Sequence, residues 1–336
     1  MNIRESLNKY STNRVQMITP ITDMSDNHIV RRVSPPREFI GKDNICGVAP
    51  YKNDTVITCS YNNENGTCWG TLSKTTLTDS GELTEVVIHT ENAGIYNIAR
   101  MGNYYYACTT DSTVICLDLT LEEHPILTKF KSIDPSSTGT SIKTNEQNNL
   151  IALTMFNGQL IVYDVTGSIK TQFKCSSRET FCCEFYNSST VLSGSEECCV
   201  NIWDIRIPKK VACVGSGYIK EAVVSLFNYD ENYIAVGTYE DCCHVYDMRS
   251  PFTPLKRIQL QGAPWSYFPM ENYYVVPSIR GGVHVFDSEF SNAQTILPAD
   301  DNKFIYGSAY LTKNHKKYIL SYDFNKRLVL QNEVTF

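Results

Sequence analysis

Long hydrophobic runs are missing from this 336-residue sequence. No segment approaches the roughly 20 consecutive apolar residues that a membrane-spanning helix needs. The first residues, MNIRESLNKYSTNRVQMITP, also lack the apolar core of a secretory signal peptide. The sequence therefore predicts a cytoplasmic protein that does not interact with membranes.

The common signatures of metal sites and hydrolases are missing as well. No C-x-x-C pair occurs and none of the six histidines completes a zinc-binding spacing, so we expect no metal and no cofactor. No G-x-S-x-G segment occurs, which excludes the standard serine site of α/β-hydrolases. The 13 cysteines are an odd number, and in a cytoplasmic chain we expect them to be reduced and to fill strands as small hydrophobic residues.

An excess of positive charge is also absent. Thirty Lys and Arg residues stand against 36 Asp and Glu, a net charge of −6, which argues against direct binding to nucleic-acid phosphates. Charged residues make up 20% and hydrophobic residues 42%, the balance of a globular protein. We expect a monomer.

The sequence does contain an internal repeat. Five eleven-residue segments align without a gap and end at Asp118, Asp164, Asp204, Asp247 and Asp287: CTTDSTVICLD, TMFNGQLIVYD, GSEECCVNIWD, GTYEDCCHVYD and PSIRGGVHVFD. The aspartates lie 46, 40, 43 and 40 residues apart. A short apolar strand, a polar turn and an alternating strand form a β-hairpin pattern, and a period near 40–45 residues is typical of a propeller blade.

Two weaker copies, SYNNENGTCWGTL and SYDFNKRLVLQNE, bracket the five and bring the number of blades to seven. The sequence therefore predicts an all-β, seven-bladed WD-repeat β-propeller as one domain over residues 26–336, with an N-terminal extension over residues 1–25. Few residues remain after Val334, so an N-terminal strand within His28–Ile40 must close the ring, and HIVRRV and REFI are the candidates.

The motifs of the last four blades follow one another in a specific order. An acidic turn leads to a W-D-x-R strand end over Gly194–Arg206, and a G-T-Y-E-D turn leads to Y-D-x-R over Gly237–Arg249. A glycine-led segment then reaches Trp265, and Tyr306-Gly307 lies in the last blade. This series resembles the WD-repeat family of diphthine methyl ester hydrolases, also called diphthine methyltransferases.

The resemblance implies an enzyme that acts on elongation factor 2. The family hydrolyses a methyl ester on a modified histidine of that factor and leaves the carboxylate that the final amidation of diphthamide biosynthesis requires. The modified side chain also carries a trimethylammonium group. Elongation factor 2 is therefore the expected protein partner.

Several residues of the blade turns are expected at one rim of the propeller, where such a reaction needs a base, donors for the carbonyl oxygen and a site for the cation. We expect Glu240 or Asp241 to be the general base and Arg280 to assist the carbonyl oxygen. Tyr239 and Trp265 would form a cation–π platform. Glu196 and Glu197 would add negative charge for the substrate.

Structural roles compete with these assignments. Acidic and amide residues of β-turns commonly bond their own backbone. Arg206 and Arg249 are expected to pair with a carboxylate of the next loop. The remaining expectations concern strand residues: Trp203, Tyr246, Phe286, His244 and His284 should be packing residues, and Cys198 and Cys199 should point to opposite faces of one strand.

The alternative function is a non-catalytic WD-repeat scaffold that docks a trafficking or ubiquitin-ligase partner. An RNA-associated propeller is a third possibility, which the acidic balance disfavours. A concave site with convergent polar groups would distinguish an enzyme, and an exposed apolar patch would distinguish a scaffold.

Overall fold

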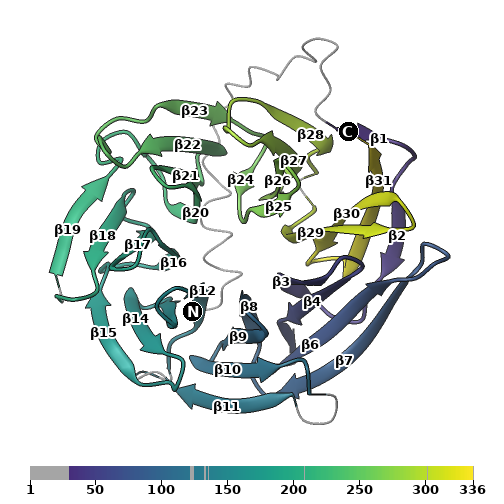
Figure 1. Ribbon diagram of the computed structural model, residues 1–336, viewed down its shortest axis with the longest axis horizontal. Helices are drawn as coiled ribbons and strands as arrows, with labels where there is room; N and C mark the ends of the chain where they lie inside the picture. The colour runs from purple at the N-terminus through teal and green to yellow at the C-terminus, as the bar shows by residue number, and fades with distance from the viewer. Residues whose placement is uncertain are drawn as a thin grey trace.

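The chain folds into seven antiparallel sheets arranged as the blades of a propeller (Figure 1). The computed structural model describes residues 30–121, 125–131, 134, 136–207, 209–300 and 302–335. These residues contain strands and no helix, and thus no helix able to cross a membrane. The predicted all-β, seven-bladed architecture is confirmed, while the predicted extension over residues 1–25 lies outside the described residues.

Each blade consists of four consecutive strands, counted from the inside of the ring outwards. The first blade holds β3 (Ile45–Lys52), β4 (Thr55–Ser60), β6 (Thr67–Leu77) and β7 (Leu83–Glu91). The second holds β8 (Ile95–Met101), β9 (Tyr104–Thr109), β10 (Thr113–Asp118) and β11 (Ile126–Lys131). The third holds β12 (Gly139–Asn145), β13 (Leu150–Met155), β14 (Gln159–Asp164) and β15 (Ile169–Lys174).

The next two blades repeat this order without change. The fourth holds β16 (Thr180–Phe185), β17 (Thr190–Ser195), β18 (Val200–Asp204) and β19 (Lys209–Val214). The fifth holds β20 (Val223–Asp230), β21 (Tyr233–Thr238), β22 (Cys242–Asp247) and β23 (Lys256–Gln259).

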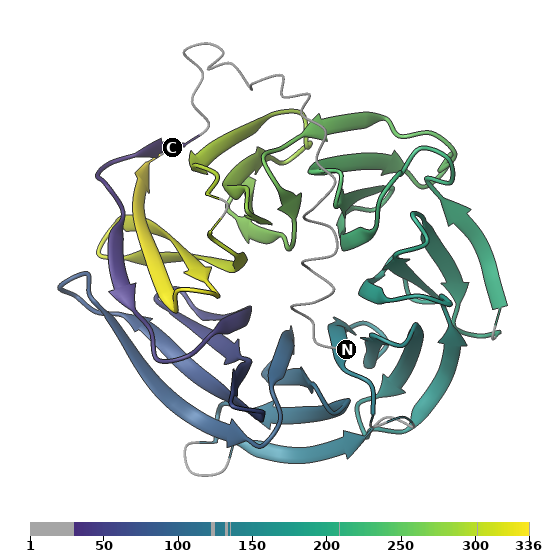
Figure 2. The same cartoon turned by 180° about the vertical axis from the view of Figure 1, so that it is seen from behind.

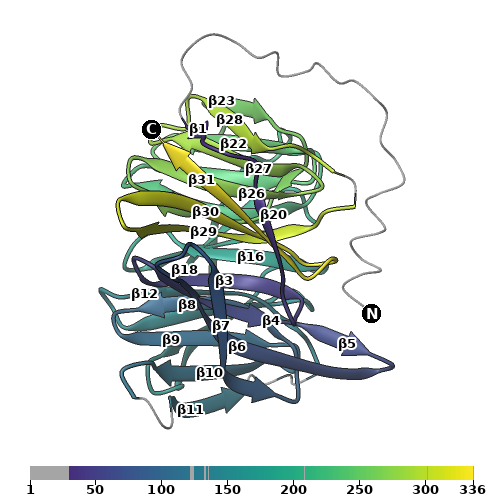
Figure 3. The ribbon, with the colours of Figure 1, turned by 90° about the vertical axis from the view of Figure 1, so that its right-hand side faces the viewer.

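The last two blades depart from the pattern. In the sixth the innermost strand is split into β24 (Ala263–Pro264) and β25 (Phe268–Met270), followed by β26 (Tyr273–Ile279), β27 (Gly282–Asp287) and β28 (Ala293–Leu297). The seventh holds β29 (Ile305–Lys313), β30 (Lys316–Asp323) and β31 (Leu328–Thr335). A further strand in the first blade, β5 (Asn62–Glu64), forms with β6 a hairpin that projects from the disc (Figure 3).

The N-terminal segment supplies the missing outer strand of the seventh blade. Both β1 (Arg31–Arg32) and β2 (Arg37–Ile40) pair antiparallel with β31. Figure 2 shows the N-terminal purple strand lying along the C-terminal yellow strand. The predicted closure is confirmed, and both candidate segments take part in it.

The repeated aspartate has a specific structural role. Asp118, Asp164, Asp204 and Asp247 end their strands, and each accepts a hydrogen bond at 2.9 Å from the backbone N–H two residues later. This Asx-turn starts the connection to the outer strand. It also corrects the prediction for the arginines, since Arg206 and Arg249 pair with these aspartates themselves, at 2.6 Å.

The core lies between neighbouring blades. Trp203 packs on Phe173 of the third blade at a ring distance of 5.0 Å, and its Nε1 donates to Ser193 Oγ at 2.9 Å. Tyr246, Phe286 and both strand histidines are buried, as predicted. All thirteen cysteines are free, and most are buried, in agreement with their expected role as strand hydrophobes.

Replacing Phe39 should weaken the closure of the ring. Phe39 lies on β2 and packs against the hydrophobic cluster of the seventh and first blades, whereas its neighbour Ile40 is 89% exposed. Phe39→Ala should lower the free energy of unfolding by about 2 kcal/mol, since part of a buried aromatic ring is lost. Ile40→Ala should change it by less than about 0.5 kcal/mol. Urea unfolding measures both, and equal effects would contradict this account of the closure.

Candidate functional site

One residue per blade points from the hairpin turn toward the central axis at one face of the ring. These residues follow the second strand of each blade directly: Tyr61, Thr110, Phe156, Glu196, Tyr239, Ile279 and Phe324. In all blades except the sixth, the backbone N–H of this residue donates to the segment before the innermost strand at 2.8–3.0 Å. We call the seven residues the collar, and four of them are aromatic.

A second set of residues faces the channel from the innermost strands. In six blades the pairing of the first two strands skips one residue, which is a β-bulge that redirects a side chain. The skipped residues are Cys46, Tyr96, Thr140, Phe181, Val224 and Tyr306. In the sixth blade, where the inner strand is broken, Trp265 takes part instead through its N–H, which donates to Pro277 O at 2.9 Å.

Aromatic rings from both sets are in contact around the channel. Phe181 meets Phe156 at 6.3 Å and Tyr239 at 6.1 Å, both edge to face. On the next blades, Trp265 meets Tyr306 at 5.1 Å. Phe181, Trp265 and Tyr306 line a channel cavity of about 310 Å³. The structure therefore places Tyr239 and Trp265 in one hydrophobic cluster, as the predicted cation platform requires.

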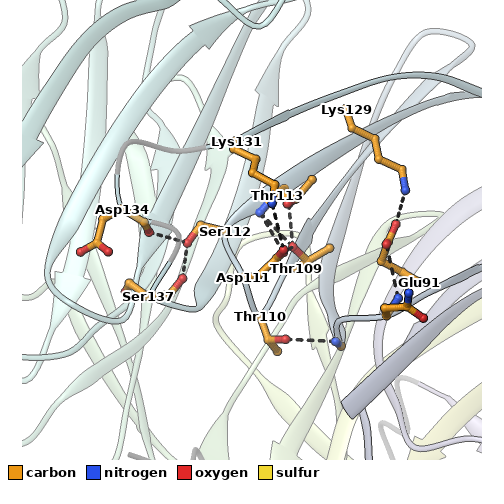
Figure 4. Close-up of polar contacts among 12 residues, drawn as sticks. Glu91, Thr109, Thr110, Asp111, Ser112, Thr113, Lys129, Lys131, Asp134 and Ser137 are labelled. Atoms are coloured by element: carbon orange, nitrogen blue, oxygen red, sulfur yellow. Dashed lines mark hydrogen bonds and ion pairs between the residues drawn. The ribbon is translucent and has the colours of Figure 1, made fainter. Parts of the chain in front are cut away.

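The position after the collar is polar, and in the second blade its role is structural. Asp111 accepts a hydrogen bond from Thr113 N at 3.3 Å and lies 3.7 Å from Lys131 Nζ (Figure 4). Burial alone would raise the pKa of Asp111, but hydrogen bonds from Thr109 and Thr113 hold it below the usual value. This carboxylate stabilises its own turn.

Glu196 and Glu197 are adjacent in sequence but face different surroundings. Glu196 is a collar residue whose side chain is only 5% exposed, with Arg178 Nη1 at 3.9 Å. Glu197 occupies the following position and accepts hydrogen bonds from Ser177 N and Oγ at 2.9 and 3.2 Å. Its pKa is lowered, because these bonds outweigh the effect of burial. Glu197 thus holds the preceding loop, as Asp111 holds its turn.

Glu240 is the counterpart of Glu197 in the fifth blade. Its Oε2 lies 3.2 Å from Nε2 of the buried His244, and its Oε1 lies 3.9 Å from Arg257. Burial would raise the pKa of Glu240, but the hydrogen bond with His244 and the nearby charges bring it below the usual value. Glu240 is therefore ionised at neutral pH and held by a histidine.

Asp241 and Arg280 both lie in tight turns with a left-handed backbone, at φ of 57° and 62°. The carbonyl oxygen of Asp241 accepts hydrogen bonds from Leu260 N at 2.8 Å and Gln259 Nε2 at 3.0 Å. Arg280 occupies the same turn position as Glu240, one blade later, and its guanidinium lies 5.3 Å from the centre of the Phe304 ring. Arg280 Nε is buried without a hydrogen-bond partner within the described part of the chain.

The turn of the fourth blade corrects the prediction for Cys198. Because β18 begins at Val200, Cys198 is not on the strand; it lies in the turn with a φ of 57°, the position that Asp241 takes in the fifth blade. Burial, together with the charges of Glu221 and Glu240 and, more weakly, Glu196, raises the pKa of the Cys198 thiol. Acidic residues of the fourth and fifth blades therefore do gather at one rim, around this cysteine.

Several aromatic residues of the mouth were not among the predicted site residues: Tyr61, Phe156, Phe181, Tyr306 and Phe324. Three of these lie in the same register as Tyr239, two of them in the weaker or less acidic repeats, so the alignment contained a signal for them. Phe181 and Tyr306 reach the channel through β-bulges, which the residue pattern does not reveal.

Comparisons with known proteins agree with the fold and with part of the predicted family. No family model matches the chain. A curated protein of Dictyostelium discoideum, "Diphthine methyltransferase homolog", is 23% identical over 174 residues. The match spans 45% of this chain and 47% of that relative, about half its length.

Two solved structures show similarity over nearly the whole chain. The WD40 β-propeller domain of Doa1 has a TM-score of 0.71 at 11% identity, covering 90% of this chain and 97% of that one. A chain of the mitotic checkpoint complex has a TM-score of 0.68 at 13% identity, covering 96% and 99%. At these identities the similarity establishes the WD40 propeller fold alone.

The two strand histidines should respond differently to acid. His284 occupies the position of His244 but has no glutamate at the preceding turn, and burial lowers its pKa from 6.5 to about 4. Since the unfolded chain binds this proton more readily, stability should be complete above pH 6.5 and fall by roughly 3 kcal/mol as the pH drops toward 4. Unfolding curves of the wild type and His284→Gln over this range measure the effect. An unchanged pH slope in the variant would contradict it.

Proposed function

We propose that the protein hydrolyses the methyl ester of diphthine methyl ester on elongation factor 2, in the cytoplasm. Water adds to the ester carbonyl, methanol leaves, and the carboxylate of diphthine remains for the final amidation. The main support is the convergence of acidic and aromatic residues from the fourth, fifth and sixth blades at one channel mouth. The partial similarity to a diphthine methyltransferase homolog supports the same substrate.

Glu240 is the proposed general base. It is ionised at neutral pH, its side chain is only 11% exposed, and its bond with His244 fixes the carboxylate at the rim. A carboxylate oriented in this way can take a proton from the attacking water. Asp241 is less suited, because its backbone is committed to a left-handed turn that points the chain into the next strand.

Arg280 is the proposed donor for the carbonyl oxygen. Its turn position is equivalent to that of Glu240 on the neighbouring blade, and its Nε–H has no acceptor among the described residues. Contact with Phe304 holds the guanidinium. A fixed cationic donor stabilises the negative charge that develops on the oxygen during attack. Glu197, which is bonded to Ser177, acts in this proposal as a support of the loop.

Glu240→Gln should lower kcat by about 100- to 10,000-fold, the range for loss of a general base. Asp241→Asn should leave kcat within about threefold of the wild type, because asparagine tolerates the same left-handed turn. The measurement is release of the ester from purified, methyl-esterified elongation factor 2, followed by mass spectrometry of the modified peptide. Thermal unfolding of each variant controls for misfolding. Full turnover by Glu240→Gln would remove Glu240 as the base.

A non-catalytic scaffold is the second candidate, and a separate surface favours it. Phe252 and Leu255, in the connection between β22 and β23, are 75% and 56% exposed, as a docking surface would require. A scaffold would leave the ester intact in the wild-type assay and would lose its partner when both residues are replaced by serine. Ester release that is unaffected by these two substitutions supports the enzyme.

A further inference from the structure

The aromatic residues around the channel divide the proposed substrate between two places. We infer that Phe181, Trp265, Tyr239 and Tyr306 form a cage for the quaternary ammonium of the substrate, with Glu196 as its counter-charge, while the ester stays at the rim. This inference rests on the proposed function, which it extends with an orientation of the substrate and with specificity residues that act through the cation.

The cage is built by the repeat itself. Phe181 comes from a bulge of the fourth blade and touches Tyr239 of the fifth, while Trp265 of the sixth touches Tyr306 of the seventh. Four consecutive blades thus contribute one ring each. Burial, together with the neighbouring hydroxyls of Tyr306 and Tyr239, raises the pKa of Tyr96 well above 10, so the rings converge across the channel.

The chemistry of the walls favours a quaternary ammonium over other ligands. A primary ammonium has three N–H donors and needs oxygen acceptors, which the ring faces of Phe181, Trp265 and Tyr306 do not supply. A trimethylammonium has no N–H and binds directly to aromatic faces. An anion would meet the negative ring faces and Glu196, whose side chain is 95% buried. The cavity of about 310 Å³ reaches the lower size range of ligand pockets.

The charged neighbours place the two ends of the substrate. Glu196 belongs to the fourth blade, between the collar residues Phe156 and Tyr239, so its negative charge lies on the side of Phe181. Arg178, at 3.9 Å from Glu196, competes with the bound cation. On the other side, Arg280 stacks on Phe304, whose ring lies 6.5 Å from Tyr306. The cation therefore fits toward Glu196 and the ester carbonyl toward Arg280.

Binding of choline and of its uncharged isostere neohexyl alcohol tests the cage directly. We expect choline to bind at least about tenfold more tightly, measured by titration calorimetry and by Trp fluorescence. Phe181→Leu and Tyr306→Leu should each weaken choline about 5- to 30-fold and leave neohexyl alcohol nearly unchanged. Glu196→Gln should weaken choline alone, and Arg178→Gln should strengthen it. Equal binding of the two probes, or no binding of choline, would overturn the inference.

A matched control separates the cage from general effects on folding. Phe130 lies on the outer strand β11 against Tyr163, away from the channel, so Phe130→Leu should leave choline binding unchanged. If Phe130→Leu weakens choline as much as Phe181→Leu, the cage is not the site. Thermal unfolding of all variants identifies any that do not fold, and the Glu196 and Arg178 pair, with opposite expected signs, keeps the test decisive.

The hydrolysis assay distinguishes failure of the cage from failure of the proposed function. Selective choline binding without ester release keeps the cation site and removes the esterase. Ester release without choline binding keeps the esterase and removes the cage. Where both hold, Phe181→Leu should raise KM with kcat little changed, whereas Glu240→Gln should lower kcat.

Discussion

Closure of the ring is the constraint on which the rest of the structure depends. Without β1 and β2, β31 would expose an unpaired edge, and nothing would hold the first and last blades together. Gly41 N donates to Arg327 O at 2.6 Å in this closure, and Asn44, a few residues on, receives the Nε–H of Arg327 at 3.0 Å. The aromatic contact between Tyr61 and Phe324 exists only because these two blades are neighbours. The channel mouth is therefore a property of the closed ring.

The repeat assigns a different task to each position of the turn. The first position reaches the channel, as Glu196 and Tyr239 do. The second position holds the turn or the preceding loop, which Asp111 and Glu197 show most clearly. The departures from this division are informative: Glu240 bonds a buried histidine instead of a loop backbone, and Arg280 lies against a ring of the next blade. Residues free of the common structural task are the ones available for chemistry.

The spacing of the aspartates was sufficient to predict the blades and the closing segment, because each hairpin needs the same turn and each ring needs its last strand. The pairing of site residues was harder to predict. Glu196 and Glu197 looked like one acidic pair, yet neighbouring residues of a turn point to different surroundings. The cage rings Phe181 and Tyr306 depend on β-bulges in innermost strands, which leave no mark on the alternation of residues. The partner of Arg206 depends likewise on turn geometry that its spacing from Asp204 does not define.

In the proposed reaction, the cage and the base are coupled through water. A carboxylate whose pKa is below its usual value takes protons poorly while it is hydrated. Burial is the largest influence on Glu240 and acts to raise its pKa, against the stabilising bond with His244. A substrate anchored by its cation would cover the rim, remove more water from Glu240 and shift that balance toward a stronger base. A side chain without the quaternary group would leave Glu240 hydrated. Selectivity for the modified histidine would then follow from desolvation, in a site that has no activated serine.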